Sequence, residues 1–212
     1  MVTIFLSGMC YAGKTTIGRL LAQRLNKYNI DSRDIFKIKY GISETEYLQQ
    51  YGKDKFKEAE EKSQKIIENK VKEITTLKAT GTKTKSGLIY QIITKGNGIK
   101  PVNGTKVLIH YAGYLENGNV FDTNYEEVAK LYGKLDQNRA NNNGYEGYPT
   151  TIGNLPFIAG FNEAVELMSF GEKILLYIPS DLGYGPQGAG DAIPPNANII
   201  FEIELLENNP TK

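Results

Sequence analysis

Two segments of the sequence carry residue types at spacings that can do chemistry. The first lies near the N-terminus, between an apolar run at residues 2–6 and a helix-like run that follows. It fits the phosphate-binding pattern G-x-x-x-x-G-K-[ST] through Gly8, Gly13, Lys14 and Thr15. In such a loop, backbone N–H groups surround a phosphate, the lysine neutralises the β- and γ-phosphates, and the threonine hydroxyl binds Mg²⁺. ATP with Mg²⁺ is therefore the cofactor that this P-loop would take.

The second segment contains no acid-base pair and no set of metal ligands, but aromatic and aliphatic residues among glycines and prolines. Four stretches stand out: Val107–Asp122 (VLIHYAGYLENGNVFD), Phe157–Phe161 (FIAGF), Leu182–Gly185 (LGYG) and Ile193–Phe201 (IPPNANIIF). In this order they resemble the FKBP-type peptidyl-prolyl cis-trans isomerases. The resemblance implies an antiparallel half-barrel sheet wrapped on one short helix, with a shallow apolar pocket between them.

The same resemblance implies roles for individual residues of the pocket. The Tyr184 hydroxyl and the Ile158 backbone N–H would hold substrate carbonyls, and Asp122 would lie close to the rotating amide. Phe121 would complete the catalytic set. The remaining substrate-binding residues would be Tyr111, Tyr148, Phe157, Phe161, Ile193 and Phe201. Phe161 stands where the family usually has tryptophan, which enlarges the predicted pocket slightly.

Isomerisation of an X-Pro bond fits a pocket without acid, base or metal. The barrier of ~18–20 kcal/mol exists because amide resonance is lost in the twisted state. A water-poor aromatic cup holds the proline ring and favours the less polar twisted amide over the dipolar planar amide. We therefore expect proline-containing polypeptides as substrates, macrolide-type ligands of the family as a second partner class, and no cofactor for isomerisation.

Composition limits the other function classes. The net charge is +1, from 25 Lys plus Arg against 24 Asp plus Glu, so the chain lacks the field that attracts nucleic acid or anionic membranes. No apolar run approaches the ~18 residues of a membrane-spanning helix. With one cysteine, Cys10, and one histidine, His110, neither an internal disulfide nor a His-rich or multi-cysteine metal site can form. We expect neither nucleic acid nor membrane as partner, no metal, and a cytoplasmic location.

The flanks of the phosphate-binding motif resemble shikimate kinase, at Ile4–Gly8 (IFLSG), Thr16–Ala22 (TIGRLLA) and Tyr51–Phe56 (YGKDKF). The resemblance is partial: Arg33 stands where that family has a second substrate-binding aspartate, and Lys57 where it has arginine. The arginine-bearing lid is missing, so half of the charge clamp for phosphoryl transfer is absent. A structural role is the preferred interpretation of this segment, and nucleotide binding is the alternative.

Hydrophobic patterning changes along the chain and divides it into parts. Residues 1–78 form the truncated P-loop kinase-like segment, residues 79–86 a polar linker, and residues 87–208 the FKBP-type domain. The fold class is α+β for the FKBP-type domain, preceded by an α/β P-loop-like, helix-rich segment.

Within these parts, period-2 and helical patterns predict the elements. Residues 43–72 are predicted to form partly amphipathic helices with solvated faces, and residues 160–168 a short helix. The insertion at 123–147 is expected to be a surface loop with one helical turn at 126–131. Strands are predicted over residues 88–94, 106–111, 172–178 and 199–206.

The function predicted from the sequence is therefore a peptidyl-prolyl cis-trans isomerase of the FKBP type. Two alternatives stay open: a non-catalytic peptide-binding or chaperone-like module on the same fold, and a nucleotide-binding protein that uses the P-loop.

Overall fold

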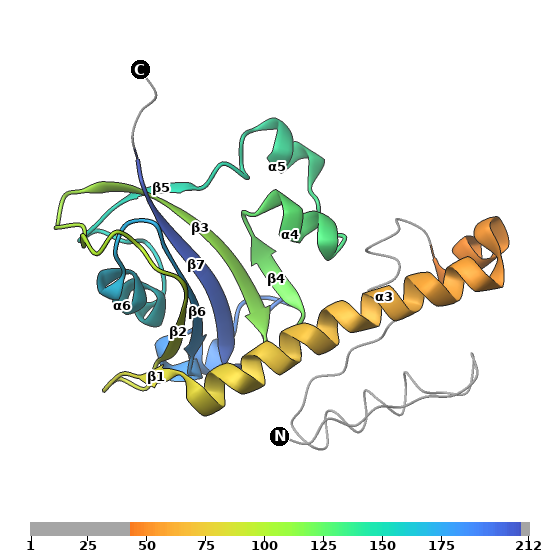
Figure 1. Cartoon of the computed structure of the whole chain (residues 1–212), viewed down its shortest axis with the longest axis horizontal. Coiled ribbons are helices and arrows are strands. Elements are labelled where there is room, and N and C mark those ends of the chain that lie inside the picture. Colours follow the sequence, from red (N-terminus) through yellow and green to blue (C-terminus); the bar gives the residue numbers. More distant parts are fainter. Residues whose placement is uncertain (1–42, 209–212) are drawn as a thin grey trace. The chain divides into compact units, whose positions relative to one another are not determined.

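A computed structural model of the chain describes residues 43–208 (Figure 1). The chain divides into two compact units, Met1–Gln64 and Lys65–Lys212. The described part of the first unit is the start of helix α3 (Glu44–Thr80). Its first turn is held by a capping box: the Glu46 N–H donates to Ser43 Oγ at 3.2 Å, and the Ser43 N–H donates to Glu46 Oε2 at 2.7 Å. Gly52, with φ of 81°, interrupts the helical geometry.

The second unit is built on an antiparallel sheet with strand order β1-β2-β6-β7-β3-β4, to which β5 adds by pairing with β3. The strands are β1 (Thr82–Lys83), β2 (Ile89–Thr94), β3 (Lys106–Leu115), β4 (Val120–Thr123), β5 (Tyr148–Thr151), β6 (Glu172–Ile178) and β7 (Ile199–Glu207). The four predicted strands are confirmed as β2, β3, β6 and β7. The short strands β1, β4 and β5 were not predicted, because two to four residues carry too little alternation to recognise.

Helix α6 (Ala159–Leu167) packs on one face of this sheet. Alternation in β7 directs Phe201, Ile203 and Leu205 to that face, where each is buried. The close approach of helix and sheet requires Gly160, since a Cβ there would lie 2.6 Å from Ile178 Cγ2. The short helix predicted at 160–168 is therefore confirmed within one residue at each end, and the domain is α+β as predicted.

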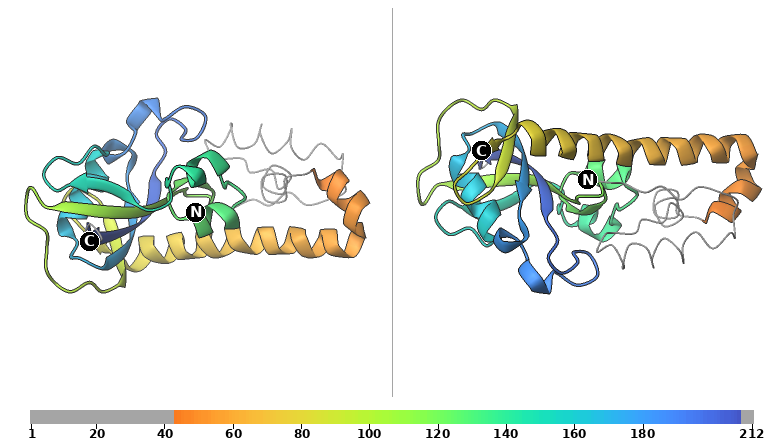
Figure 2. Two further views of the ribbon diagram at one scale, coloured as in Figure 1. Left: turned by 90° about the horizontal axis from the view of Figure 1, so that it is seen from above. Right: turned by 90° about the horizontal axis from the view of Figure 1, so that it is seen from below.

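The C-terminal half of α3 packs on the opposite face of the sheet (Figure 2). Ile74 and Leu77 are 2% and 0% exposed, and they share a core cluster with side chains of β3, β4, β6 and β7. These are Ala112, Tyr114, Val120, Leu175 and Ile200, together with Tyr132. The helix therefore covers this face of the sheet.

On this covered face a network of ion pairs surrounds the Glu202 carboxylate, which the helix shields from solvent. Lys70 Nζ lies 2.5 Å from Glu202 Oε1, and Lys173 Nζ lies 3.1 Å from Glu202 Oε2. Burial opposes the charge of Glu202, yet the two lysines together lower the pKa of its carboxyl below the ordinary value. A lysine of α3 thus pairs with the buried carboxylate of β7, although the sequence pattern assigned this helix to a separate segment of the chain.

The predicted domain boundary differs from the observed division. The compact unit begins at Lys65, inside α3, rather than at residue 87. The segment predicted as a linker, residues 79–86, contains the end of α3 and strand β1, which pairs with β2 through Thr82↔Tyr90 and Lys83↔Ile89. The last residues of α3 and the two residues of β1 are polar and largely exposed, which is why the composition of this segment suggested a linker.

The insertion between β4 and β5 is more ordered than predicted. The predicted helical turn is helix α4 (Glu126–Leu131), and a second helix, α5 (Gln137–Asn141), follows it. Asp136 caps α5 by accepting hydrogen bonds from the N–H groups of Asn138 and Arg139. The insertion is anchored to the sheet where Lys134 Nζ donates to the Val120 carbonyl at 2.6 Å. None of the described helices is long and apolar enough to cross a membrane.

Packing of α3 on the sheet leads to a test in the full chain. We expect Leu77→Ala to lower the free energy of unfolding of the second unit by ~2–5 kcal/mol, because it leaves a cavity in a fully buried cluster. Thr75→Ala, on the exposed side of the same turn, is the control. Urea unfolding followed by tyrosine fluorescence measures both. Equal effects of the two substitutions would show that α3 does not stabilise the sheet.

Candidate functional site

Six aromatic rings form a connected cluster between the sheet and α6. Phe161 and Phe201 are its centre, with ring centroids 5.1 Å apart and planes at 89°. Such edge-to-face contacts are favoured between aromatic rings. From this centre the cluster extends through Phe157, 4.6 Å from Phe161, and then Tyr148, 5.2 Å from Phe157. Phe121 contacts Phe201 at 5.5 Å, and Tyr111 lies 6.1 Å from Phe201 and 6.3 Å from Phe161.

Phe161, in the position where tryptophan was expected, is 2% exposed at the base of this cluster. Phe201 is 5% exposed, whereas Tyr111, Phe121 and Phe157 are only partly buried. Tyr148, on β5, is 42% exposed. The rings therefore run from a closed base to an open rim, and apolar surface at that rim is available to a ligand.

Gly113 of β3 makes room for two of these rings. A Cβ at this position would lie 2.5 Å from Phe121 Cζ and 2.8 Å from Phe201 Cε1. Both aromatic side chains therefore lie directly over the glycine, which positions them in the cluster. Sequence reasoning did not single out Gly113, although it sits in the A-G-Y run of β3.

Asp122 lies beside the cluster with its carboxylate held on three sides. The Tyr111 hydroxyl donates to Oδ2 at 2.5 Å, and both Arg139 Nη1 and the Thr123 N–H donate to Oδ1 at 2.8 Å. Burial and the neighbouring Asp122 raise the pKa of Tyr111 to about 12. Partial burial opposes the charge of Arg139, but hydrogen bonds to Asp122 and Tyr111 raise its pKa overall. At neutral pH the Tyr111 phenol is thus neutral and the Arg139 guanidinium is charged.

Arg139 is a site residue that sequence reasoning missed. It lies on α5 in the insertion, where its Nε also donates to the Gly144 carbonyl at 3.0 Å and its guanidinium stacks over Tyr145. The insertion, expected from the sequence to be a surface loop, therefore contributes a residue to the site. Its observed contact with the site is the ion pair with Asp122.

The other predicted pocket residues lie in the segment just before α6 and in the connection between β6 and β7. Ile158 immediately precedes α6, so its N–H is free of the helix's own hydrogen bonds. Tyr184, between two 3₁₀ helices (Ser180–Leu182 and Gly185–Gln187), is 36% exposed. Burial first, and then the charge of Asp122, raise the pKa of the Tyr184 phenol above its ordinary value. Ile193 is 3% exposed in the same loop region, where its backbone bridges to Ala189.

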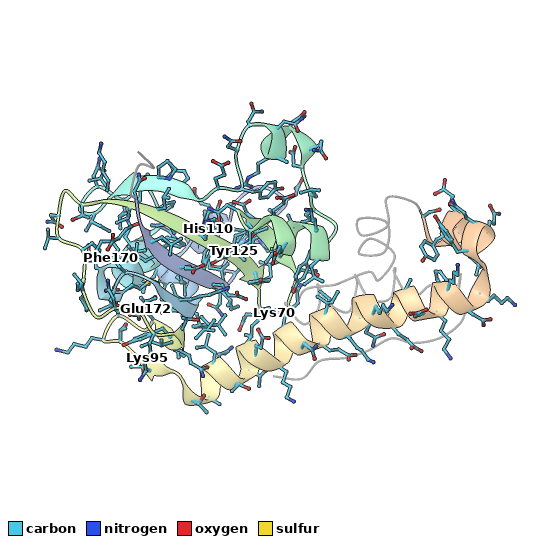
Figure 3. The ribbon with its side chains drawn as sticks, turned by 45° about the horizontal axis from the view of Figure 1, so that its top comes forward. Lys70, Lys95, His110, Tyr125, Phe170 and Glu172 are labelled. Carbon is cyan, nitrogen blue, oxygen red and sulfur yellow. The ribbon has the colours of Figure 1, made fainter. Side chains whose placement is uncertain are left out.

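His110 lies outside the aromatic cluster. It stacks on Tyr125 with ring centroids 5.1 Å apart (Figure 3), and its Nδ1 has no hydrogen-bond partner in the described structure. His110, in strand β3, thus packs against an aromatic ring. Among residues 43–208, no group of three His, Cys, Asp or Glu side chains is arranged to hold a metal ion. The four P-loop residues, Gly8, Gly13, Lys14 and Thr15, lie outside the described residues.

Comparison with known families gives two matches on different parts of the chain. Residues 97–206 match the family described as FKBP-type peptidyl-prolyl cis-trans isomerase. Residues 11–81 match the shikimate kinase family. The second match begins after Gly8 and ends one residue beyond α3.

Individual relatives agree with the first match. A probable FKBP-type peptidyl-prolyl cis-trans isomerase of Haemophilus influenzae is 38% identical over 127 residues, which cover 60% of this chain and 45% of that protein. An FK506-binding protein of Neisseria meningitidis is 37% identical, covering 57% of this chain and 95% of the relative. The FKBP-type 22 kDa isomerase of Escherichia coli is 38% identical, covering 58% and 51%. The chain thus spans about half the length of two of these three relatives.

Among solved structures, a peptidyl-prolyl cis-trans isomerase from Pseudomonas syringae pv. tomato matches 68% of this chain and 93% of its own, with 27% identity and a TM-score of 0.47.

The position of Gly113 under two rings gives a prediction about packing. We expect Gly113→Ala to lower the free energy of unfolding by ~1–3 kcal/mol, because the added methyl group overpacks the cluster. Replacing the Phe121 ring by a smaller side chain, in the double variant Gly113→Ala/Phe121→Leu, should recover part of the lost free energy of unfolding. A double-mutant cycle by urea unfolding measures the coupling. If Gly113→Ala costs the same with and without Phe121→Leu, the Phe121 ring does not limit the space at this glycine.

Proposed function

The chain belongs to the FKBP-type peptidyl-prolyl cis-trans isomerases, and we propose that its aromatic cluster with Asp122 at the rim is the pocket in which X-Pro bonds of polypeptide substrates rotate. The observation that carries this proposal is the juxtaposition of an open, ring-lined apolar surface with one fixed carboxylate. No other side-chain acid or base is needed for this reaction.

The apolar cluster supplies the main effect on the barrier. A planar amide is stabilised by resonance and by water around its dipole, and both are lost as the bond twists over ~18–20 kcal/mol. When a proline ring binds against Phe161, Phe201 and Tyr111, its peptide bond is removed from the water that stabilises the planar amide. The twisted amide, which is less polar, is therefore bound more tightly than the planar amide, as catalysis requires.

Polar groups at the rim orient the substrate around that ring. We assign the Ile158 N–H and the Tyr184 hydroxyl to substrate carbonyls, since both are donors beside the cluster. Asp122 faces the rotating amide. Its orientation is set by Tyr111 and Arg139, which hold opposite oxygens of the carboxylate at 2.5 and 2.8 Å. A carboxylate fixed in this way does not have to reorganise while the amide dipole changes.

Arg139 provides a test of the polar rim. We expect Arg139→Ala to lower kcat/KM on X-Pro tetrapeptides by about tenfold, or ~1.4 kcal/mol, because the Asp122 carboxylate loses one of its fixed partners. A protease-coupled isomerisation assay measures the rate. Lys130→Ala, which removes an exposed cation of the same insertion that is paired with Glu126, is the matched control and should leave the rate unchanged.

The same assay separates the leading function from its alternative. If the wild-type chain binds proline peptides without accelerating their isomerisation, the protein is a non-catalytic binding module of this fold. Equal losses in the Arg139 and Lys130 variants would show that Arg139 does not act through Asp122.

We also propose that the pocket takes macrolide-type ligands, because a relative from Neisseria meningitidis is named an FK506-binding protein and aligns over 95% of its length. Competition of FK506 with the tetrapeptide substrate would support this. A cytoplasmic location stays part of the proposal, on the basis of a single cysteine and balanced charge.

For the kinase-like segment we propose a structural rather than a catalytic role. The match to shikimate kinase extends to residue 81, and its last turns are those in which Ile74 and Leu77 are buried against the isomerase sheet. This use of the helix favours a supporting function. Arg33, in place of a substrate-binding aspartate, also speaks against phosphoryl transfer to shikimate.

Lys14 tests that role. We expect ATP with Mg²⁺ to leave the melting temperature unchanged in both the wild type and Lys14→Ala, since a working site would add about 2.7 kcal/mol at a hundredfold excess over Kd. Differential scanning calorimetry of the full chain measures this. A stabilisation that is present in the wild type and lost in Lys14→Ala would establish a nucleotide site instead.

A further inference from the structure

The outer edge of strand β2 is largely without a neighbour in the described structure. Strand β1 pairs only with Ile89 and Tyr90, at the start of β2. From Gln91 to Thr94 the strand pairs with β6 on one side, and no described strand lies on the other. Alternate residues of such an edge direct their N–H and C=O groups outward, where they can pair with another extended chain.

This edge also exposes apolar side chains. Ile92 and Ile93 are 44% and 52% exposed, and a β-bulge between Ile92 and Thr94 interrupts the normal alternation of the strand. Soluble proteins commonly protect an edge with lysine, proline or charged side chains. The segment Gln91–Thr94 contains none of these, so its surface favours addition of a strand.

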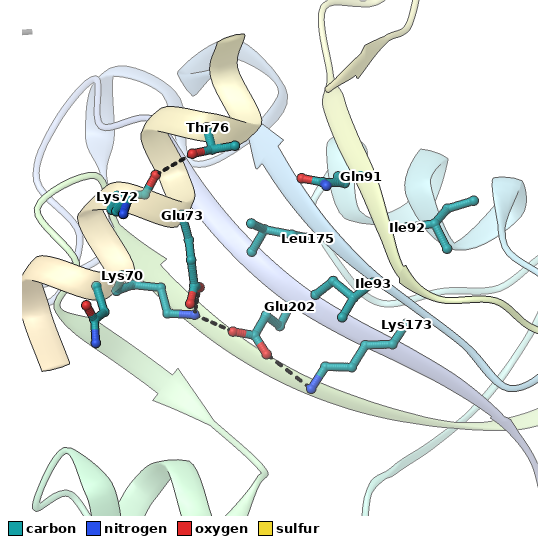
Figure 4. A pocket seen from close by; sticks show the side chains of 11 residues that line it. Lys70, Lys72, Glu73, Thr76, Gln91, Ile92, Ile93, Lys173, Leu175 and Glu202 are labelled. Carbon is teal, nitrogen blue, oxygen red and sulfur yellow. Dashed lines mark hydrogen bonds and ion pairs between the residues drawn. The ribbon is translucent and has the colours of Figure 1, made fainter. Parts of the chain in front are cut away.

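A groove of about 750 Å³ borders the edge on the side of α3 (Figure 4). We call it the β2 groove; its walls are Asn69, Lys72 and Thr76 of α3 and Gln91 and Ile93 of β2. Its floor is formed by Leu175 and by the Lys70–Glu202–Lys173 network. Both walls belong to the unit that begins at Lys65.

The charge of the groove restricts what can occupy it. Three lysines (Lys70, Lys72 and Lys173) and two glutamates (Glu73 and Glu202) line it, which leaves one net positive charge. A segment that mixes apolar residues with an acidic one complements both the isoleucines and this charge. A strongly basic segment does not.

We propose that the β2 groove binds an extended apolar segment, neutral to acidic in charge, of an unfolded client polypeptide, which adds a strand to the sheet at residues 91–94. The proposal rests on the proposed isomerase function, whose pocket lies on the α6 face of the same sheet. When the β2 groove holds one segment of a client polypeptide, the effective concentration of that client's nearby X-Pro bonds at the pocket rises. Short peptides are too short to occupy the pocket and the β2 groove together, so the groove does not raise their rate of isomerisation.

The first experiment examines the backbone of β2 in the wild-type full chain. Hydrogen exchange is measured with and without a reduced, carboxymethylated protein that cannot fold. We expect the amides within residues 91–94 that point away from β6 to exchange rapidly in the free chain and to become protected by about tenfold on binding. Absence of added protection of these outward amides in the complex would overturn the proposal. So would their strong protection in the free chain, since another part of this chain or a second copy would then occupy the edge.

The second experiment compares two matched variants of the full chain. Ile92→Lys/Ile93→Lys puts two charges on the edge, while Ile99→Lys/Val102→Lys puts them on apolar positions outside the groove that are 62% and 73% exposed. We expect only the first variant to raise the Kd for the unfolded protein, by about tenfold. Turnover of an X-Pro tetrapeptide should stay unchanged in both variants.

The readouts separate this proposal from the proposed function. If the wild type fails to turn over tetrapeptides but binds the unfolded protein through β2, only the isomerase function fails. If tetrapeptides are turned over and both lysine variants bind the unfolded protein like the wild type, the groove proposal fails alone. Conversion of a dimer to a monomer by Ile92→Lys/Ile93→Lys, measured by light scattering, would assign the edge to a second copy and also overturn it.

Discussion

Strand β7 has to satisfy two different surroundings, because alternate side chains of one strand point to opposite faces of a sheet. Phe201 and Ile203 are buried on the face of α6, where Phe201 forms part of the aromatic cluster. Ile200 and Glu202 lie on the other face, under α3. The position of the site therefore depends on the packing of a helix on the opposite face of the sheet. Removing the helix would expose the back of the strand that supports the base of the site.

The buried carboxylate of Glu202 makes this arrangement specific. An ion placed in a poorly hydrated environment is costly unless it is paired on several sides. Lys70 of α3 and Lys173 of β6 provide that pairing, and the Tyr114 hydroxyl adds a contact at 3.3 Å. In the observed position of α3, Lys70 reaches Glu202 while Ile74 and Leu77 reach the apolar cluster, and a shift of the helix along its axis would separate these contacts. The network thus selects the register of the helix, whereas apolar burial supplies most of the stabilisation.

Prediction from the sequence was reliable where the pattern was long or the motif specific. The strands β2, β3, β6 and β7 have six to ten residues of β-branched and aromatic composition, and the helix beside FIAGF has a clear apolar face. The residues predicted to line the pocket could be proposed because the motifs that carry them follow the order of a known family. The structure brings six of these aromatic residues into one connected cluster.

What the sequence could not give depends on contacts between distant residues. Arg139 lies in a polar stretch of asparagines, and nothing local marks it, since its role arises from a carboxylate 17 positions earlier in the chain. The docking of α3 was missed for a related reason. Ile74 and Leu77 are isolated among charged and polar residues, so the helix resembles a solvated one until the sheet that buries them is known.

The shikimate kinase match includes helix α3, whereas the FKBP match begins at residue 97, after the helix has ended, and this bears on how the chain is organised. Shikimate kinase similarity extends to residue 81, yet from Lys65 onward the same residues belong to the compact unit of the isomerase fold. The Lys70 side chain is paired with Glu202, and the Leu77 side chain is buried in the apolar cluster of the isomerase sheet. A substitution in these turns acts first on the isomerase sheet. Similarity to the kinase family in this segment therefore describes its sequence, whereas the structure assigns it a supporting role in the other domain.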